Sequence, residues 1–283
     1  MLLITGANGQ LGQELKRIYK DKNIIFVSKE QLDITNEQKL SNFFAVNNID
    51  LVINCAAYTD VEQAENNIEV CQKINIEGIK NLAKFSKKHN FFIVHISTDY
   101  VFDGTNHLPY KETDKVNPVS VYGKSKLQGE KELFNYADKA IIIRTSWIYS
   151  EFSKNFLKKI LNLSDNKNEI NVICDQIGTP TYAYDLAKVI SEILSKIDIK
   201  NYNKKEIYHF SNEGVASWYD FAYEIIKISD KSCQIKPIKA KDYKTLAKRP
   251  YYSILDKEKL KSDFSIDIRH WKEGLIECLQ RLV

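Results

Sequence analysis

The sequence lacks the features that define several large classes of protein. Its five cysteines are widely spaced and include no C-x-x-C pair, so they indicate neither a disulfide framework nor a zinc site. No stretch approaches the roughly 20 apolar residues of a membrane-spanning helix, and the apolar start of the chain is too short for a signal-peptide core. We therefore expect reduced thiols, a cytoplasmic location and no membrane partner.

A large excess of one charge is missing as well. The 41 basic and 37 acidic residues give a formal net charge of +4 at pH 7 and are spread along the chain of 283 residues. They form no basic block of the kind found in nucleic-acid-binding tails, so we expect no nucleic-acid partner. A hydrophobic fraction of 43% and a charged fraction of 28% are typical of a folded, soluble enzyme rather than a disordered chain.

What the sequence does contain, up to about residue 150, is a series of short apolar runs that alternate with helical patterns. The runs cover residues 2–5, 24–27, 51–54, 91–97 and 140–144. Near-continuous apolar strands separated by helices predict a parallel sheet with helices on both faces. We therefore assign residues 1–150 to a Rossmann-type, doubly wound α/β domain.

The pattern changes from residue 151 onward. Helical patterns at 156–161, 186–197, 218–228 and 271–282 are separated by polar, loop-like stretches at 175–181 and 240–252. We expect residues 151–283 to form a smaller, mostly helical α/β part that holds the substrate, with some segments returning to the Rossmann sheet.

A glycine-rich turn follows the first apolar run and opens the first amphipathic helix, which is the context that a dinucleotide-binding turn requires. Glycines allow the tight turn and a close approach of the backbone to a pyrophosphate, and the helix N-terminus offers free N–H groups. The G-x-x-G-x-x-G spacing resembles the turn of short-chain dehydrogenases. The residues that we assign to the cofactor here are Gly6, Asn8, Gly9, Gln10, Leu11 and Gly12.

The second apolar run ends near residues that could choose between NAD and NADP. We assign Ser28 and Lys29 to the cofactor; Lys29 would suit a 2'-phosphate, whereas Glu30 would suit the free ribose hydroxyl of NAD. We expect NADPH, with NADH as the alternative. Two further segments resemble cofactor-binding segments of the short-chain dehydrogenases: Asp33 and Ile34 near the adenine, and Ala56, Ala57, Tyr58 and Thr59 in a third cofactor turn.

Tyr122 and Lys126 form a Y-x-x-x-K pattern, which on a helix places a phenol and an ammonium on the same face. A nearby cation stabilises phenolate, and so moves the phenol pKa of about 10 toward the range where it can act as a general acid or base. The strand that precedes this helix ends at Thr98, whose hydroxyl would complete a pair of groups that bind a carbonyl oxygen. We assign Thr98, Tyr122 and Lys126 to catalysis.

Three segments resemble the dTDP-4-dehydrorhamnose reductases, a family of extended short-chain dehydrogenases. They span residues 97–104, 122–130 and 144–147, and the likeness continues in the family's order through 155–156, 175–181 and 249–255. The resemblance implies NAD(P)H-dependent reduction of the C4 keto group of dTDP-4-dehydro-L-rhamnose to dTDP-L-rhamnose, a step in the biosynthesis of cell-surface polysaccharide such as O-antigen.

The resemblance also implies roles for individual residues. Tyr122 would protonate the developing alkoxide, Lys126 would hold the nicotinamide ribose and lower the Tyr122 pKa, and Thr98 would bind the carbonyl oxygen. Asn155 and Arg249 would approach the nucleotide diphosphate. The full set of implied substrate-binding residues is Thr98, Asp99, Val101, Phe102, Trp147, Asn155, Gln176 and Arg249.

Metal binding and oligomeric state follow from the sequence only weakly. Glu14 matches a position that binds a bridging magnesium in some dimeric members of the family, so Mg²⁺ is a possible cofactor, but no other ligand can be placed and we assign no metal site. His95 and His209 lie in apolar surroundings and are expected to be packed structural histidines. The chain is expected to be a monomer or a homodimer.

Three other functions share parts of this pattern. A sugar-nucleotide 4,6-dehydratase is disfavoured, because Tyr100 stands where those enzymes have a glutamate. A reductase of different C4 stereochemistry, such as one that makes a deoxytalose nucleotide, is the second choice among enzymes, because the sequence does not distinguish the two products. A non-catalytic regulatory subunit of the methionine adenosyltransferase type keeps this fold, but the intact Thr98, Tyr122 and Lys126 favour an enzyme.

Overall fold

A parallel sheet of six strands forms the centre of the computed structural model, which describes residues 1–19 and 24–282. Residues 20–23 and 283, which fall inside the two expected parts of the chain, lie outside the described residues. In spatial order the strands are β10 (Lys205–Phe210), β5 (Ala140–Thr145), β4 (Phe92–Thr98), β3 (Leu51–Asn54), β1 (Leu2–Thr5) and β2 (Ile24–Val27).

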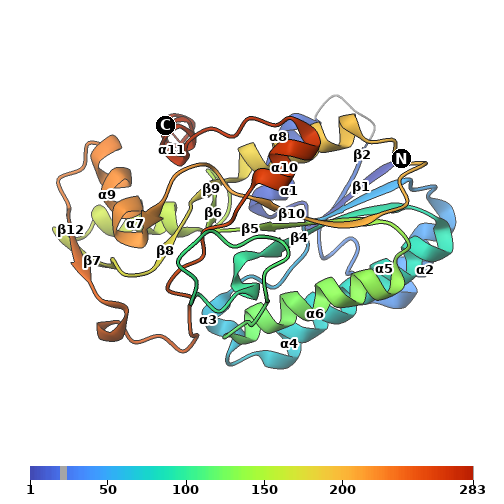
Figure 1. The fold of residues 1–283 in the computed structure, drawn as a ribbon, viewed down its shortest axis with the longest axis horizontal. Helices are drawn as coiled ribbons and strands as arrows, with labels where there is room; N and C mark the ends of the chain where they lie inside the picture. The colour runs from blue at the N-terminus through green and yellow to red at the C-terminus, as the bar shows by residue number, and fades with distance from the viewer. Residues whose placement is uncertain (20–23, 283) are drawn as a thin grey trace.

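Helices cover both faces of this sheet, as Figure 1 shows. On one face lie α1 (Gln10–Ile18), α8 (Ala183–Lys196) and α10 (Glu258–Phe264), whose apolar side chains share a buried cluster with the strands. On the other face lie α2 (Glu37–Val46), α5 (Gly78–His89) and α6 (Val121–Tyr136), around a second cluster. This arrangement confirms the expected doubly wound parallel sheet.

The order of the strands determines where a ligand can bind. The chain passes from β1 to β2 on one side and then returns to β3 on the other, so the winding direction reverses between β1 and β3. In doubly wound sheets the ligand lies at such a switch point, outside the carboxyl ends of the strands. The glycine-rich turn follows β1 and the turn that begins at Cys55 follows β3, so both meet at this edge.

A smaller part packs beside the carboxyl edge of the sheet and occupies the left half of Figure 1. It contains α7 (Phe156–Ser164), α9 (Trp218–Ile228) and α11 (Trp271–Gln280) around a third apolar cluster. Short strand pairs join these helices: β7 (Glu169–Ile173) with β12 (Gln234–Ile238), β6 (Ile148–Tyr149) with β9 (Thr181–Tyr182), and β8 (Ile177–Gly178) with β11 (Ala216–Ser217).

The remaining elements are short and lie near the carboxyl edge or in the connections. They are α3 (Val61–Ala64), α4 (Ile68–Gln72), the π-helical turn η1 (Lys73–Glu77), and the 3-10 turns η2 (Asp99–Val101) and η3 (Ala240–Asp242). Strand β10 and helices α8 and α10 come from beyond residue 150 yet belong to the Rossmann sheet and its cover.

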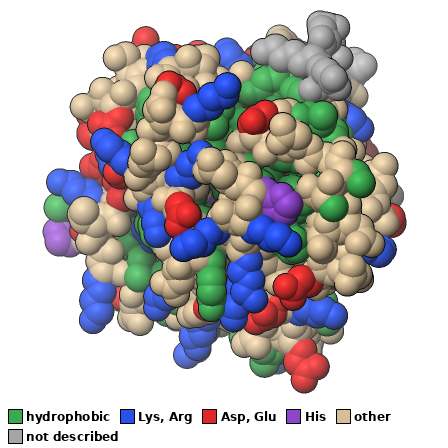
Figure 2. Space-filling model, turned by 90° about the vertical axis from the view of Figure 1, so that its right-hand side faces the viewer, with side chains coloured by type: hydrophobic (Ala, Val, Ile, Leu, Met, Phe, Trp, Pro, Cys, Tyr) green, Lys and Arg blue, Asp and Glu red, His purple; other side chains and the backbone are tan. Residues whose placement is uncertain are grey.

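The surface carries mixed charge. On the face drawn in Figure 2, Lys and Arg side chains alternate with acidic and uncharged ones. Within residues 1–19 and 24–282, the structure has no helix that is both long enough and apolar enough to span a bilayer.

Candidate active site

Three neighbouring cavities follow the carboxyl edge of the sheet. The central cavity, of about 450 Å³, is lined by the end of β4, the start of α6 and the start of α1. The turn cavity, of about 240 Å³, lies beside the glycine-rich turn and shares Gly9, Cys55 and Ala57 with the central one. The outer cavity, of about 680 Å³, shares Val61, Tyr100 and Trp218 with the central cavity on its other side. An elongated ligand could therefore run from the turn cavity into the central one.

The glycine-rich turn has the form of a phosphate cradle. Gly6 has φ +65°, and a Cβ there would lie 2.6 Å from the Ala56 nitrogen. A Cβ at Gly12 would lie 2.5 Å from the Gly6 carbonyl oxygen, so neither position accepts a side chain. Helix α1 begins directly after Gly9, whose position has no side-chain cap, which leaves the first N–H groups available to an anion. The residues present thus fit a dinucleotide pyrophosphate.

The structure brings most of the predicted cofactor residues to these two cavities. Around the turn cavity are Gly6, Asn8, Gly9, Ser28, Lys29, Asp33, Ile34, Ala56 and Ala57, and around the central cavity are Gln10, Leu11, Gly12, Thr59, Tyr122 and Lys126. The Ser28 hydroxyl donates to Glu30 Oε2 at 2.6 Å, so the serine and the glutamate that bear on NADP or NAD selectivity lie in contact.

Tyr58, predicted to bind the cofactor, is not among the described residues that line the three cavities, and its backbone is held by Asn75. Its N–H donates to Asn75 Oδ1 at 2.9 Å, and its carbonyl accepts from Asn75 Nδ2 at 3.1 Å. Asn75 also donates to the Ser125 hydroxyl at 3.0 Å and so ties this turn to α6. It lies in η1, and π-turns within helices are frequent at functional sites. Asn75 was not among the residues predicted from the sequence.

Tyr122 and Thr98 face each other in the central cavity. Ser120 caps α6 by accepting the Gly123 N–H at 3.1 Å, which places Tyr122 in the first turn of the helix. Thr98 is the last residue of β4, and its hydroxyl, which donates to Asp99 Oδ1 at 3.0 Å, lies on the wall of the same cavity as the phenol. Burial raises the pKa of Tyr122, and the neighbouring Thr98 hydroxyl opposes this rise. The phenol therefore keeps its proton at neutral pH, as a proton donor must.

Lys126 is buried one helical turn further along α6. Its side chain is 2% exposed, and Nζ donates to the Ile96 carbonyl at 2.6 Å and lies 3.3 Å from His95 Nε2. Burial lowers the pKa of Lys126 to about 8, and Glu130 opposes the fall. Glu130 itself is held by Arg144 at 2.7 Å, which anchors α6 to the neighbouring strand β5.

Asp99 and Trp147 complete the wall of the central cavity. Burial raises the pKa of Asp99 to about 7, against hydrogen bonds with Ser253 and Thr98. Trp147 has φ 46°, an unusual backbone conformation for a bulky residue, and its ring stacks on Trp218 at 3.5 Å between centroids and 8° between planes. Both indoles lie on the cavity wall, and Trp218 was not predicted as a site residue.

The outer cavity is rich in cationic side chains. Arg249 lies on its wall and pairs with Glu62 at 2.8 Å. Gln176 lines it too, and its buried Oε1 has no hydrogen-bond partner among the described residues. The cationic side chains of this wall that the sequence analysis did not select are Lys159, Lys167 and Lys244.

Three residues that the sequence analysis assigned to the substrate are placed differently: two lie away from the cavities, and the third is hydrogen-bonded to other protein groups. Val101 and Phe102 are fully buried, and Phe102 stacks on Tyr110 at 4.2 Å in a separate apolar cluster. Neither lines any of the three cavities, as far as the structure describes the chain. Asn155 does line the central cavity, but its amide donates to Gln10 Oε1 at 2.9 Å and its Oδ1 caps α7. Its contacts therefore position the loop against the glycine-rich turn.

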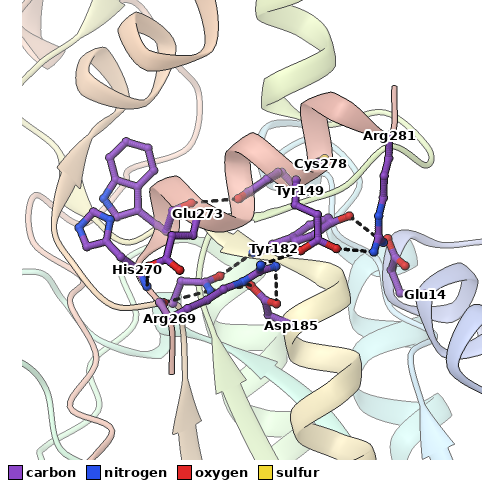
Figure 3. Close-up of polar contacts among 12 residues, drawn as sticks. Glu14, Tyr149, Tyr182, Asp185, Arg269, His270, Glu273, Cys278 and Arg281 are labelled. Carbon is purple, nitrogen blue, oxygen red and sulfur yellow. Dashed lines mark hydrogen bonds and ion pairs between the residues drawn. The ribbon is translucent and has the colours of Figure 1, made fainter. Parts of the chain in front are cut away.

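Glu14, the position linked to magnesium, lies in a cluster of charged groups that Figure 3 shows in part. Arg17 Nη1 lies 3.2 Å from Glu14 Oε2 and 2.7 Å from Glu151 Oε1, and Arg281 follows at 3.8 Å from Glu151. Arg17 and Arg281 thus supply the positive charge beside the Glu14 and Glu151 carboxylates. The described residues hold no group of three or more His, Cys, Asp or Glu side chains that could ligate a metal, so their carboxylates do not form a magnesium site within one chain.

Replacing Glu14 by glutamine is expected to stabilise the protein at pH 8 and not at pH 5. Burial, followed by the Glu151 carboxylate, raises the pKa of Glu14 to about 8. A group whose pKa is raised on folding stabilises the fold at low pH and loses that contribution as the pH rises through the folded value. Glutamine mimics the protonated acid, so the melting temperature should exceed that of the unmodified protein by about 2–4 °C at pH 8.

Thermal unfolding at both pH values measures this difference. The exposed Glu37→Gln substitution on α2 serves as the control and should change the melting temperature equally at pH 5 and pH 8. An equal effect of Glu14→Gln at the two pH values would show that Glu14 does not resist ionisation.

Comparison with known proteins identifies the family. The family model described as "RmlD substrate binding domain" matches residues 1–283. A dTDP-4-dehydrorhamnose reductase of Aggregatibacter actinomycetemcomitans is 41% identical, over 97% of this chain and 96% of that protein. This chain belongs to the dTDP-4-dehydrorhamnose reductase family.

Solved structures agree with this assignment. The reductase of Clostridium acetobutylicum is 40% identical and superimposes with a TM-score of 0.93, covering 99% of both chains. The reductase of Bacillus anthracis, solved in complex with NADP, is 35% identical with a TM-score of 0.93, covering 99% of this chain and 98% of that one. The resemblance noted from the sequence is thereby confirmed.

Proposed function

We propose that this member of the dTDP-4-dehydrorhamnose reductase family reduces the C4 keto group of dTDP-4-dehydro-L-rhamnose to give dTDP-L-rhamnose, with NADPH as the reductant. The observation that carries the proposal is the position of the Thr98–Tyr122 pair and Lys126. These groups line a cavity that meets the phosphate cradle on one side and a cavity rich in cationic side chains on the other.

The chemistry needs a hydride, which NADPH supplies when bound, and a proton, which the protein must supply. Thr98 and Tyr122 are placed to hold the carbonyl oxygen between two hydroxyl groups, and Tyr122 delivers its proton to that oxygen as negative charge develops. Lys126 is one helical turn from Tyr122 on the wall of the central cavity, where it would hold the nicotinamide ribose of bound NADPH.

The outer cavity suits the nucleotide end of the substrate. A nucleotide diphosphate carries negative charge, and on this wall Arg249 and three lysines outnumber the Glu62 and Glu169 carboxylates. Guanidinium groups bind paired phosphate oxygens well. Trp147 and Trp218 separate this end from the reacting sugar, and their stacked rings offer an apolar wall to its ring and methyl group.

NADPH rather than NADH is favoured by Lys29 on the turn cavity and by the NADP complex of the relative from Bacillus anthracis. Lys29 offers a positive charge to a 2'-phosphate, whereas the Glu30 carboxylate already accepts a hydrogen bond from Ser28. A direct comparison of KM for the two cofactors tests this choice.

The function is tested by following NADPH oxidation with enzymatically prepared dTDP-4-dehydro-L-rhamnose and identifying the product sugar by NMR. The expected result is oxidation with formation of dTDP-L-rhamnose. A 6-deoxytalose product would instead indicate a reductase of the other C4 stereochemistry. An absence of oxidation with either nicotinamide cofactor would contradict the proposal, and binding to a methionine adenosyltransferase would then support a regulatory subunit.

A further inference from the structure

Behind Lys126 lies a buried chain of polar groups that the mechanism above does not use. His95 on β4 is 1% exposed, and its Nε2 is 3.3 Å from Lys126 Nζ. Its other ring nitrogen, Nδ1, is 3.0 Å from Asn54 Nδ2 at the end of β3. The Thr5 hydroxyl at the end of β1 continues the chain by donating to Asn54 Oδ1 at 2.6 Å. Three adjacent strands therefore support the lysine from behind.

The contacts of Asn54 fix the tautomer of His95. Asn54 Nδ2 also lies 3.3 Å from the Ala56 carbonyl, which can only accept a hydrogen bond. This contact identifies the Asn54 atom that faces His95 as the amide nitrogen, a donor. His95 Nδ1 must accept that bond, so the proton of the neutral ring lies on Nε2. Burial holds the pKa of His95 well below its usual value, so the ring stays neutral.

This tautomer directs an N–H group at Lys126. A charged ammonium carries only donors, so His95 Nε2–H and the ammonium cannot form a hydrogen bond with each other. An uncharged amine has a lone pair that accepts from Nε2–H, while one of its own hydrogens still donates to the Ile96 carbonyl at 2.6 Å. The histidine therefore stabilises the uncharged form of Lys126 relative to the charged form.

The other groups around Lys126 act in both directions. Glu130 on α6 favours the charged form, as do Cys71 on α4 and Cys55 after β3 if they ionise. Burial keeps both thiols protonated by raising the pKa of each cysteine. The Glu130 carboxylate also accepts hydrogen bonds from Arg144 Nη2 at 2.7 Å and from the Ser97 hydroxyl at 2.5 Å. His95 is thus a neighbour that opposes the charge on Lys126 through a directed N–H group.

We propose that His95 is a positioning residue for Lys126, whose uncharged form it stabilises through the directed Nε2–H group. The inference rests on the proposed reduction. When Lys126 is uncharged, its amine accepts from His95 Nε2–H at 3.3 Å while one of its own hydrogens donates to the Ile96 carbonyl at 2.6 Å.

The tautomer can be measured without substrate or cofactor. Nitrogen-15 NMR of the labelled protein distinguishes Nδ1–H from Nε2–H in each histidine, and His95→Gln assigns the His95 signals. The expected result is a neutral His95 with the proton on Nε2 from pH 5 to pH 9. A proton on Nδ1, or a charged ring at pH 6, would overturn the inference whether or not the protein reduces the proposed sugar.

The effect on Lys126 is measured by titrating its Nζ signal, assigned with Lys126→Met, in the unmodified protein and in His95→Gln. Glutamine can turn its amide oxygen toward Nζ and accept from the ammonium, so we expect the pKa of Lys126 to rise by about one unit or more. The alkaline limb of the kcat profile should move to higher pH by the same amount. No rise in the pKa of Lys126 would overturn the role of His95.

His209→Gln is the matched control. His209 is also a fully buried histidine in the central sheet, on β10, where its Nδ1 lies 3.0 Å from the Tyr110 carbonyl. This substitution removes a comparable buried ring but should leave the pKa of Lys126 and the alkaline limb in place. An equal shift in both variants would assign the effect to general loosening of the sheet and contradict a specific role for His95.

Discussion

Replacing Tyr122 by phenylalanine is expected to lower kcat by about 10²–10⁴-fold, the usual contribution of a positioned general acid. The phenol lines the central cavity together with Thr98, and phenylalanine keeps its ring while removing the transferable proton. The dissociation constant for NADPH, measured by fluorescence titration, should change by less than about threefold, because the ring still fills the same space.

Tyr100→Phe provides a matched control for that experiment. Tyr100 is buried and borders the central cavity, and the centroid of its ring lies 5.8 Å from that of Tyr122. The side chain that acts on its hydroxyl is Arg249 and not Thr98. Tyr100→Phe should retain most of the turnover that Tyr122→Phe loses. Near-normal kcat in Tyr122→Phe would show that the proton comes from another group.

Removing the hydroxyl of Thr98 is expected to have the next largest effect. Thr98→Val keeps the shape of the side chain but removes the hydroxyl that we propose binds the carbonyl oxygen, and the loss of one such donor costs about 10²–10³-fold in kcat. The same hydroxyl accepts the Tyr100 N–H at 3.2 Å and starts η2, so a modest fall in melting temperature should accompany the loss.

Thr98→Ser separates the two effects, because serine restores the hydroxyl without the methyl group. Its kcat should lie within about threefold of the unmodified enzyme. Steady-state kinetics with the proposed sugar nucleotide and a thermal melt of each variant provide the comparison. Equal losses of kcat in the valine and serine variants would mean that packing, rather than the hydroxyl, explains the importance of Thr98.

The parts of the site that lie close together in the sequence could be predicted from it. The glycine-rich turn is one loop and the Tyr122–Lys126 pair is one helical turn, so spacing alone places their side chains together. The alternation of strands and helices likewise predicts the doubly wound sheet. Local sequence also predicted that Thr98 would lie at the end of its strand, since the apolar run ends there.

The parts formed by distant segments could not be predicted in this way. Trp218 opens a helix about 70 residues after Trp147, and no local pattern indicates that the two rings stack. Asn75 acts because a π-turn aims its amide at the backbone of Tyr58, which spacing does not reveal. Val101 and Phe102 illustrate the opposite case, since they follow Thr98 in sequence but turn into an apolar cluster.

His95 shows how burial alone can mislead. An apolar strand with one histidine predicts a packed ring, and the ring is indeed fully enclosed. Its two nitrogens nevertheless lie between Asn54 and Lys126, one from the neighbouring strand and one from a helix. The contacts that give His95 its proposed role come from residues 41 and 31 positions away in the chain, so only the fold brings them together.

The transfer of deuterium from NADPH labelled at the nicotinamide C4 position tests the proposed reduction most directly. The enzyme would be incubated with the labelled cofactor and dTDP-4-dehydro-L-rhamnose, and the product sugar examined by NMR. The account predicts dTDP-L-rhamnose with deuterium at C4 and no label elsewhere in the sugar. Label at another carbon, or an unlabelled sugar formed while the cofactor stays reduced, would contradict it.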